Sequence, residues 1–215
     1  MPTRPPRPEP TEAYKRFKDS MIIDYGKWRD GEPYDIAALA GVTPAERDLL
    51  VDEIIDRGGS LDWRDVEALK ALGTEKALKR IGKAAHAERG GGGAEALIHE
   101  VETKGWTPEN EKRLIDMLEN VRSMESASDR LYELCEQHQT PAVIAQLMRN
   151  ARTQSDETMR YSAGAFLLYL SGHDDNWYGL DDKFRPHLLD LNSSDYKTYK
   201  AAVAWLEDMV ANPKK

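Results

Sequence analysis

The sequence of 215 residues lacks most of the features that would identify a catalytic reaction or a bound cofactor. Its single cysteine, Cys135, cannot form a disulfide within the chain, which favours a reducing compartment. It has no apolar run close to the roughly 20 residues that a membrane-spanning helix needs. Its first residues carry proline and arginine where a signal peptide has an apolar core. We therefore expect a cytoplasmic protein with no membrane segment.

The sequence also has few groups that could hold a metal or a cofactor. Its five histidines include no pair three or four residues apart, the spacing that brings two ligands to one face of a helix. Asp174, Asn176 and Gly179 match three positions of a calcium-binding loop, but Tyr178 and Arg185 stand where oxygen ligands belong. We expect no metal, no cofactor and no catalytic residues.

An excess of positive charge is also lacking: 38 acidic residues outnumber 30 basic ones, and the net charge is −8. Residues 1–29 carry seven basic and four acidic side chains, whereas residues 30–60 carry two basic and eight acidic ones. Proteins that bind nucleic acid by its phosphates usually show a basic face, so we expect no nucleic-acid partner. Two interpretations of the acidic block stay open: it attracts a basic protein, or it only keeps the chain soluble.

Four threonines recur at a regular interval where helical patterns begin. Thr43, Thr74, Thr107 and Thr140 are separated by 31, 33 and 33 residues, and all but Thr74 are followed by proline. Threonine is a good helix N-cap, and proline is favoured at the first helical position. A fixed period of this length is typical of proteins built from repeated helix pairs.

Apolar residues at helical spacing, separated by glycines, complete the pattern. Residues 62–87 predict a helical hairpin with a break at Gly73, and a linker follows at residues 89–93, where Gly90 to Gly93 act as a hinge. Residues 26–33 resemble a loop. The apolar run 163–170 predicts a buried helix. No segment alternates apolar and polar residues as a strand does.

These patterns predict an all-α fold, a solenoid of stacked antiparallel helix pairs with about 10–12 helices. We expect a flexible proline-rich tail at residues 1–10. A single domain over residues 11–215 follows it. Within that domain, residues 11–42 should be irregular, and residues 181–211 should form helices that cap the stack.

One segment carries a resemblance to a known family. Asp62 to Leu78, DWRDVEALKALGTEKAL, resembles a repeat of the HEAT type. Together with residues 13–31 and 34–35, it is similar to small bacterial HEAT-like proteins that are often encoded beside toxins. The resemblance covers residues 12–80 well and 176–191 loosely, whereas residues 88–126 depart from a regular repeat. It implies an immunity protein, which inhibits one cognate toxin by covering its active site in a one-to-one complex.

Exposed aromatic side chains are the natural anchors of such a complex, because aromatic residues often dominate binding energy. We expect partner contacts in an acidic aromatic loop and in a second patch beside the acidic block. The loop candidates are Trp177, Tyr178, Asp174, Asp175, Asp181 and Asp182, and the second patch is Trp28 with Tyr34. The alternative for Trp177 is a ring packed under the capping helices.

Two other functions fit a helical-repeat architecture. A scaffold in a larger assembly would share all the features above. HEAT-like DNA glycosylases for alkylated bases resemble this chain in architecture, but they need a basic groove, which the charge distribution disfavours. The partner that the sequence favours is therefore a toxin protein with a basic cleft.

Overall fold

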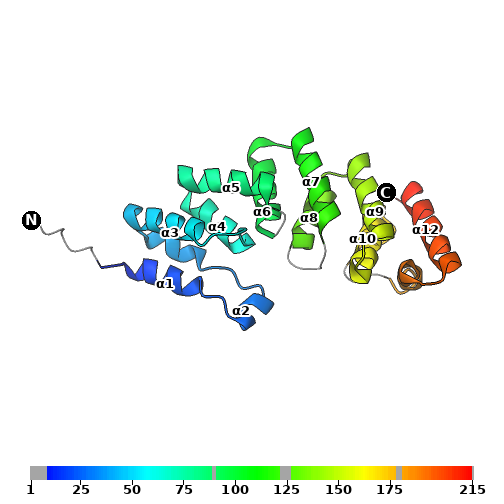
Figure 1. The fold of residues 1–215 in the computed structure, drawn as a ribbon, viewed down its shortest axis with the longest axis horizontal. Coiled ribbons are helices and arrows are strands. Elements are labelled where there is room, and N and C mark those ends of the chain that lie inside the picture. Colours follow the sequence, from blue (N-terminus) through cyan, green and yellow to red (C-terminus); the bar gives the residue numbers. More distant parts are fainter. Residues whose placement is uncertain (1–8, 89–90, 122–126, 178–180, 215) are drawn as a thin grey trace, which may run out of the picture. The chain divides into compact units, whose positions relative to one another are not determined.

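The computed structural model describes residues 9–88, 91–121, 127–177 and 181–214. Within these ranges the regular structure is helical throughout, with twelve α-helices, two short 3₁₀ helices and no β-strand (Figure 1). This confirms the predicted all-α class. No helix in the described ranges is both long and apolar enough to cross a membrane. The predicted tail, residues 1–10, lies outside them apart from Glu9 and Pro10.

The chain forms two compact units, Met1–Ala96 and Leu97–Lys215. The first unit contains α1 (Glu12–Ser20), α2 (Tyr25–Arg29), the 3₁₀ helix η1 (Ile36–Gly41), α3 (Pro44–Asp56), α4 (Trp63–Leu72), α5 (Glu75–Ala87) and the start of α6 (Gly91–Lys104). The second unit contains the rest of α6, α7 (Pro108–Asn120), α8 (Ala127–Gln137), α9 (Pro141–Thr153), α10 (Glu157–Leu170), α11 (Arg185–Leu189), the 3₁₀ helix η2 (Asp190–Asn192) and α12 (Tyr196–Ala211).

The four regularly spaced threonines each begin a helix, as predicted. Thr43, Thr74, Thr107 and Thr140 are the N-caps of α3, α5, α7 and α9, and each side-chain oxygen accepts a hydrogen bond from the backbone N–H three residues on. Each bond satisfies one of the N–H groups that a helix start leaves without an intrahelical partner. In the first unit α3 contacts both α4 and α5, and in the second α7 contacts both α8 and α9.

The core of the first unit forms where α1 and η1 pack on α3, α4 and α5. Phe17 of α1 is fully buried and meets the ring of Tyr34 edge to face, with 6.1 Å between the ring centroids. Helix α1 lies so close to η1 that a Cβ at Gly41 would be 2.9 Å from the Cβ of Ala13. This close contact positions α1 against η1. It thereby also sets the position of the end of α1, from which the chain continues to α2.

Two local predictions are wrong in part. Residues 26–33 are not a loop throughout, because α2 occupies Tyr25–Arg29 and is capped by the carboxylate of Asp24, which accepts from the N–H of Lys27 at 2.9 Å. Gly91, Gly92 and Gly93 do not form a hinge, because they are the first turn of α6. Gly90 lies outside the described residues.

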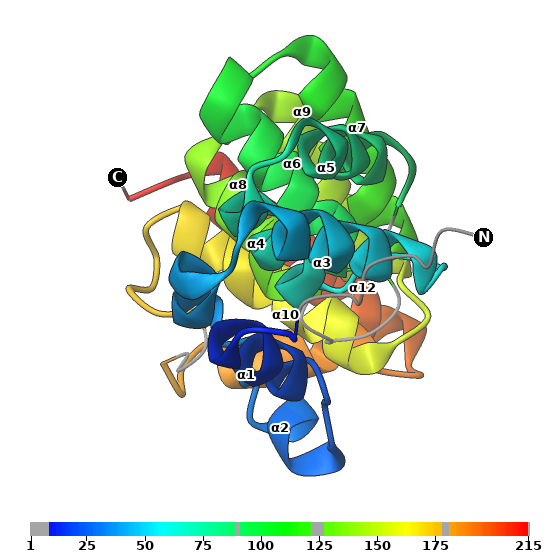
Figure 2. The same ribbon diagram turned by 90° about the vertical axis from the view of Figure 1, so that its left-hand side faces the viewer.

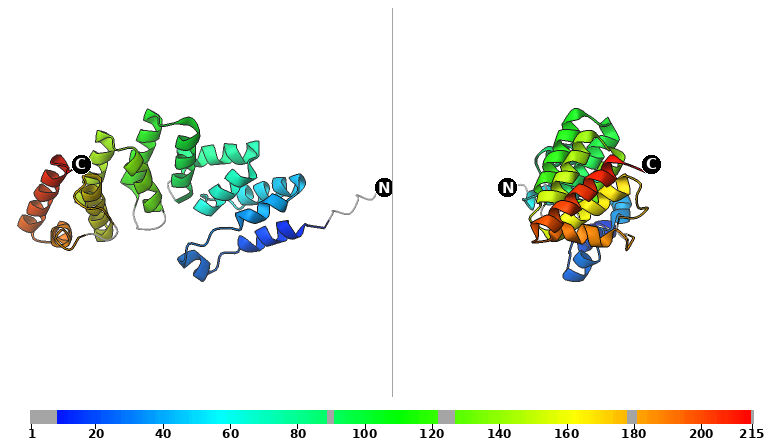
Figure 3. Two further views of the ribbon diagram at one scale, coloured as in Figure 1. Left: turned by 180° about the vertical axis from the view of Figure 1, so that it is seen from behind. Right: turned by 90° about the vertical axis from the view of Figure 1, so that its right-hand side faces the viewer.

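The second unit is built around α10, which is buried along most of its length, as its sequence predicts. Small residues in α10 let neighbouring helices approach: a Cβ at Gly164 would be 2.7 Å from Leu188 and 3.2 Å from Leu191. Figure 3 shows α12 lying across α10, and a hydrogen bond from Lys214 N–H to the carbonyl of Ser171 ties the chain after α12 to the end of α10.

Candidate functional site

The acidic aromatic loop after α10 is held together by its own carboxylates. Asp174 accepts hydrogen bonds from the N–H groups of Asn176, at 3.0 Å, and Asp181, at 2.8 Å. Asp181 pairs with the ammonium of Lys183 at 2.6 Å, and this pairing lowers the pKa of Asp181. These two carboxylates shape the loop, because their oxygens are bonded within it. Asp175 and Asp182 are exposed, and the predicted contact Tyr178 lies outside the described residues.

Trp177 packs against an aromatic cluster of the second unit. Its ring meets Tyr132 of α8 edge on at 5.0 Å between centroids, and Phe166 of α10 at 5.3 Å. Tyr132 and Phe166 are themselves buried and stacked on each other at 4.5 Å. Only part of the indole therefore remains exposed, and the packing that holds it comes from α8 and α10.

This packing predicts that Trp177 contributes to stability. Trp177→Ala is expected to lower the free energy of unfolding by about 2 kcal/mol, less than the cost for a fully buried tryptophan because part of the ring is exposed. Urea unfolding followed by circular dichroism measures the change. Asp175→Ala, in the same loop and exposed, is the control and is expected to change stability by less than about 0.5 kcal/mol. A Trp177→Ala protein as stable as the wild type would contradict this packing role.

The second predicted patch, Trp28 with Tyr34, does not form. Tyr34 is only 5% exposed, and its hydroxyl donates to the carboxylate of Asp65 at 3.0 Å. Burial is the main cause that raises the pKa of Tyr34. Trp28 is 57% exposed and is instead stacked with Tyr25, with 6.0 Å between the ring centroids. Tyr34 thus belongs to the core, and Trp28 belongs to a different surface.

That surface, which we call the α2 patch, consists of Ile22, Tyr25 and Trp28. These three side chains are 69%, 74% and 57% exposed. Met21 and Ile23 on either side of Ile22 pack against the core instead, so the chain alternates between inward and outward side chains as it enters α2. Figures 1 and 2 show α2 at the edge of the first unit, beyond α1. Three large apolar side chains are therefore presented together on one short segment.

Sequence reasoning missed Ile22 and Tyr25 as members of this surface. The available signal was the spacing of three between Tyr25 and Trp28, which places two side chains on one face of a helix. The sequence predicts a loop over residues 26–33, which include Trp28 but not Tyr25, and in a loop this spacing has no such meaning.

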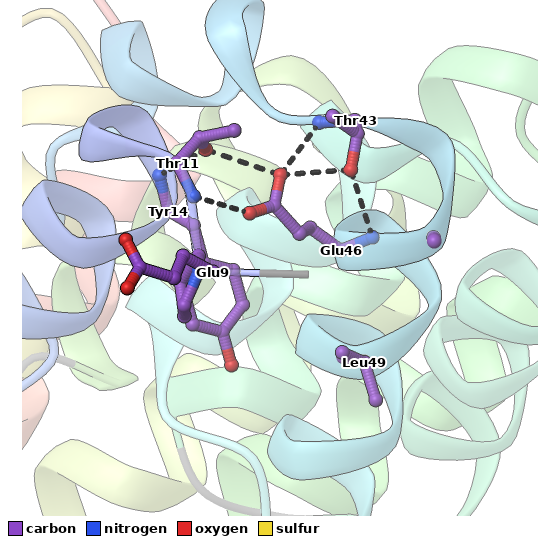
Figure 4. A pocket seen from close by; sticks show the side chains of 8 residues that line it. Glu9, Thr11, Tyr14, Thr43, Glu46 and Leu49 are labelled. Atoms are coloured by element: carbon purple, nitrogen blue, oxygen red, sulfur yellow. Dashed lines mark hydrogen bonds between the residues drawn. The ribbon is translucent and has the colours of Figure 1, made fainter. Parts of the chain in front are cut away.

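The first unit also has a cavity of about 520 Å³ at the starts of α1 and α3. Its lining residues are Glu9, Pro10, Thr11, Tyr14, Thr43, Ala45, Glu46 and Leu49. Figure 4 shows the carboxylate of Glu46, one of the lining residues, between Thr11 and Thr43. It accepts from both backbone N–H groups, at 2.7 and 2.9 Å, and from both hydroxyls, at 3.1 and 2.8 Å.

Glu46 thus joins the N-caps of two helices through one charge. The hydrogen bond from the N–H of Thr11 is the largest cause that lowers the pKa of Glu46 to about 2. Because the folded protein holds this pKa below its ordinary value of 4.5, the ionised carboxylate stabilises the fold at neutral pH. This contribution is complete above about pH 4.5 and is lost as the pH falls toward 2.

Glu46→Gln is therefore expected to lower the free energy of unfolding at pH 7, by an amount that shrinks as the pH falls from about 4.5 to about 2. Urea unfolding of both proteins across this range measures the difference. Glu9→Gln removes an exposed carboxyl from the same cavity and is expected to change stability by less than about 0.5 kcal/mol. A difference between Glu46→Gln and wild type that stays constant with pH would contradict the role assigned to Glu46.

Elsewhere among the described residues, we find neither an activated nucleophile nor a cluster of metal ligands. Cys135 is fully buried, and burial raises the pKa of its thiol far above the ordinary value, so it is a poor nucleophile. Among the described residues, no group of three or more histidine, cysteine, aspartate or glutamate side chains could hold a metal ion. No protein-family model matches the chain, and searches of curated proteins and of solved structures find no match either.

Proposed function

We propose that this protein acts by binding another protein, with the α2 patch as its principal contact surface. The observation that carries the proposal is the exposure of Ile22, Tyr25 and Trp28, each more than half exposed, within seven residues. Tyrosine and tryptophan are enriched among the residues that dominate binding energy, because each buries a large rigid ring with little loss of side-chain entropy. The rings of Tyr25 and Trp28 stack on each other, and this contact preorganises both side chains for binding.

In its specific form, the proposal is that the partner is a toxin and this chain its immunity protein. The resemblance to HEAT-like immunity proteins supports it, and so does the acidic block that follows the patch in the sequence. Residues 30–60 carry eight acidic and two basic side chains, and most of them belong to α3 of the same unit. An acidic helix in the same unit as the aromatic anchors suits a toxin whose catalytic cleft is basic, because opposite charge speeds encounter and fixes orientation.

We further propose that the helix pairs continue along the chain as one solenoid. The equal spacing of the four capping threonines supports this arrangement, as does the contact of α3 with α5 and of α7 with α9. A solenoid would give the partner an extended surface, and a specific one-to-one complex needs about 1,200 to 2,000 Å² in total.

The test is co-expression of the tagged protein with the product of its neighbouring gene, followed by affinity capture and a growth assay. We expect a stable one-to-one complex, and we expect the neighbour to stop growth when it is expressed alone. If the two proteins form a stable complex but the product of the neighbouring gene does not stop growth, protein binding is supported. The proposed role then changes from toxin inhibitor to scaffold. No complex and no toxicity would overturn the immunity proposal.

A further inference from the structure

The α2 patch is small, and most of its surface belongs to two rings. An aromatic side chain buries roughly 150 to 250 Å² when it is fully covered, so the exposed parts of Tyr25 and Trp28 together offer about 250 Å². A folded partner of standard size covers about 800 Å² on each side of an interface. The patch by itself therefore matches a short segment of a partner and not a broad folded surface.

The arrangement of the two rings selects the kind of segment. Their planes are inclined by only 29°, and their centroids are 6.0 Å apart. Aromatic surfaces of this kind bind proline-rich segments, whose extended polyproline II helix forms before binding. Such a segment loses little entropy when it binds, which matters most on a small surface. An amphipathic helix would instead need a groove that takes anchors over two turns, and the patch presents three side chains of one short segment.

The basic side chains around the patch are already bonded. Residues 19–32 carry four acidic and two basic side chains. The ammonium of Lys27 donates to the carbonyl of Ile22 at 3.1 Å, and Arg29 pairs with Asp30 at 2.7 Å. The remaining charge at this edge of the first unit is therefore negative.

Two carboxylates beside the patch are available to a partner. Asp19 adjoins Ile22, whose N–H donates to the Asp19 carbonyl at 3.3 Å. The backbone of Glu32 is held against α2, because its N–H donates to the carbonyl of Lys27 at 2.9 Å. Both side chains are exposed, and neither carboxylate has a hydrogen bond or ion pair within the described residues. They complement a positive side chain next to the patch.

We propose that the α2 patch receives an extended, proline-rich segment of the protein partner that also carries arginine or lysine. Proline rings of this segment pack on Tyr25 and Trp28, and its basic side chains pair with Asp19 and Glu32. The inference rests on the proposed protein-binding function and names the chemistry of the partner segment that reaches the patch.

The experiment uses the isotope-labelled full chain and an acetylated peptide amide, Arg-Pro-Pro-Arg-Pro, followed by amide chemical shifts in NMR. This peptide has the sequence of residues 4–8, which is of the required composition. We expect it to shift the amide signals of the three residues of the α2 patch and to leave that of Tyr196 unchanged. Arg-Ala-Ala-Arg-Ala keeps the charge but lacks the proline rings, so it should bind at least about fivefold more weakly. Glu-Pro-Pro-Glu-Pro, with the opposite charge, should also bind more weakly than the arginine peptide.

Variants of the chain locate the contacts. Trp28→Ala should remove the shifts that the peptide causes, and Tyr196→Ala should leave them unchanged. Asp19→Asn combined with Glu32→Gln should weaken peptide binding by about threefold or more, the effect of exposed ion pairs. Asp175→Asn removes an exposed carboxylate of the second unit and should leave the affinity unchanged. Circular dichroism of each variant checks that the helices are retained.

Three results would overturn the inference. The first is the absence of shifts at the α2 patch at the highest soluble concentration of the arginine peptide. The second is equal binding of the alanine peptide, which would make the patch indifferent to proline. The third concerns Pro5, Pro6 and Pro8 of this chain. If changing all three to alanine in the full chain shifts the signals of the α2 patch without added peptide, the chain's own segment occupies it.

The failure of this inference is distinguishable from the failure of the proposed function. A captured partner that protects Tyr25 and Trp28 from oxidation, while no proline peptide binds, would leave protein binding intact and remove the proline-rich segment. Peptide binding at the patch without any captured partner would support the chemistry assigned to the patch and remove the neighbouring gene product as the partner. Where both succeed, excess peptide should release the captured partner.

Discussion

Gly92→Ala is expected to lower the free energy of unfolding by about 3 kcal/mol, because the first turn of α6 has no room for a side chain. A Cβ at Gly92 would overlap the backbone carbonyl of Leu61, and it would lie 2.9 Å from the Cβ of Leu61. Backbone atoms cannot rotate out of the way as the end of a side chain can. The segment before α4 is moreover fixed by a hydrogen bond from Leu61 N–H to the carboxylate of Glu88, at 2.6 Å.

Gly82→Ala is the matched control, since the same substitution in α5 is expected to have the opposite sign. A Cβ at Gly82 would meet no atom within 4 Å. Alanine is a better helix former than glycine by about 1 kcal/mol, so this variant should gain about 0.5 to 1 kcal/mol. Urea unfolding of the three proteins gives both values. A Gly92→Ala protein that gains stability as Gly82→Ala does would show that Gly91 to Gly93 are a loose linker.

Tyr25→Ala combined with Trp28→Ala is expected to weaken partner binding by about 2 to 4 kcal/mol, or roughly 30- to 1,000-fold in affinity. The reason is that the two rings supply the largest exposed apolar surface on α2, and a few such aromatic anchors usually carry most of the binding energy of an interface. Titration calorimetry with the captured partner measures the affinity. Stability should change by less than about 1 kcal/mol, because both side chains are mostly in solvent.

Tyr196→Ala is the control for this experiment. Tyr196 is 70% exposed, close to the 74% of Tyr25, but it stands in the first turn of α12 in the second unit. We expect its removal to leave the affinity unchanged. If instead the double variant binds as tightly as the wild type and keeps its helical spectrum, the α2 patch is not a principal contact.

The sequence predicted the helix starts well because they depend on local chemistry. A threonine that caps its own helix bonds three residues ahead, so Thr43 and Thr140 could be recognised without knowledge of the fold. The same holds for the break at Gly73, whose φ of 64° requires a left-handed backbone that glycine adopts without strain.

The sequence predicted the surface poorly because exposure depends on distant contacts. Tyr34 is buried by the ring of Phe17 and bonded to Asp65, which is 31 residues away, and neither contact is visible in a local pattern. Helix α2 has only five residues, too few for an apolar period to be recognised. The fourfold bonding of Glu46 likewise needs Thr11, which is 35 residues away, to reach the capping box of α3.

Glycine was the residue most easily misread. A run of glycines is typical of a flexible linker, and the sequence alone favoured a hinge at Gly90 to Gly93. In the structure, Gly92 and Gly93 are buried in a helix, and an added side chain would overlap backbone atoms of Leu61 and Glu88. These two glycines are needed for close packing, which no composition rule reveals.

The central claim, that the α2 patch contacts a protein partner, is tested most directly by hydroxyl-radical footprinting of the free protein and of its complex. Mass spectrometry gives the oxidation rate of each aromatic side chain. We expect the rates of Tyr25 and Trp28 to fall when the partner binds, and the rate of Tyr196 to stay the same. Unchanged oxidation of Tyr25 and Trp28 in a complex that protects Tyr196 would contradict the claim and place the contact surface in the second unit.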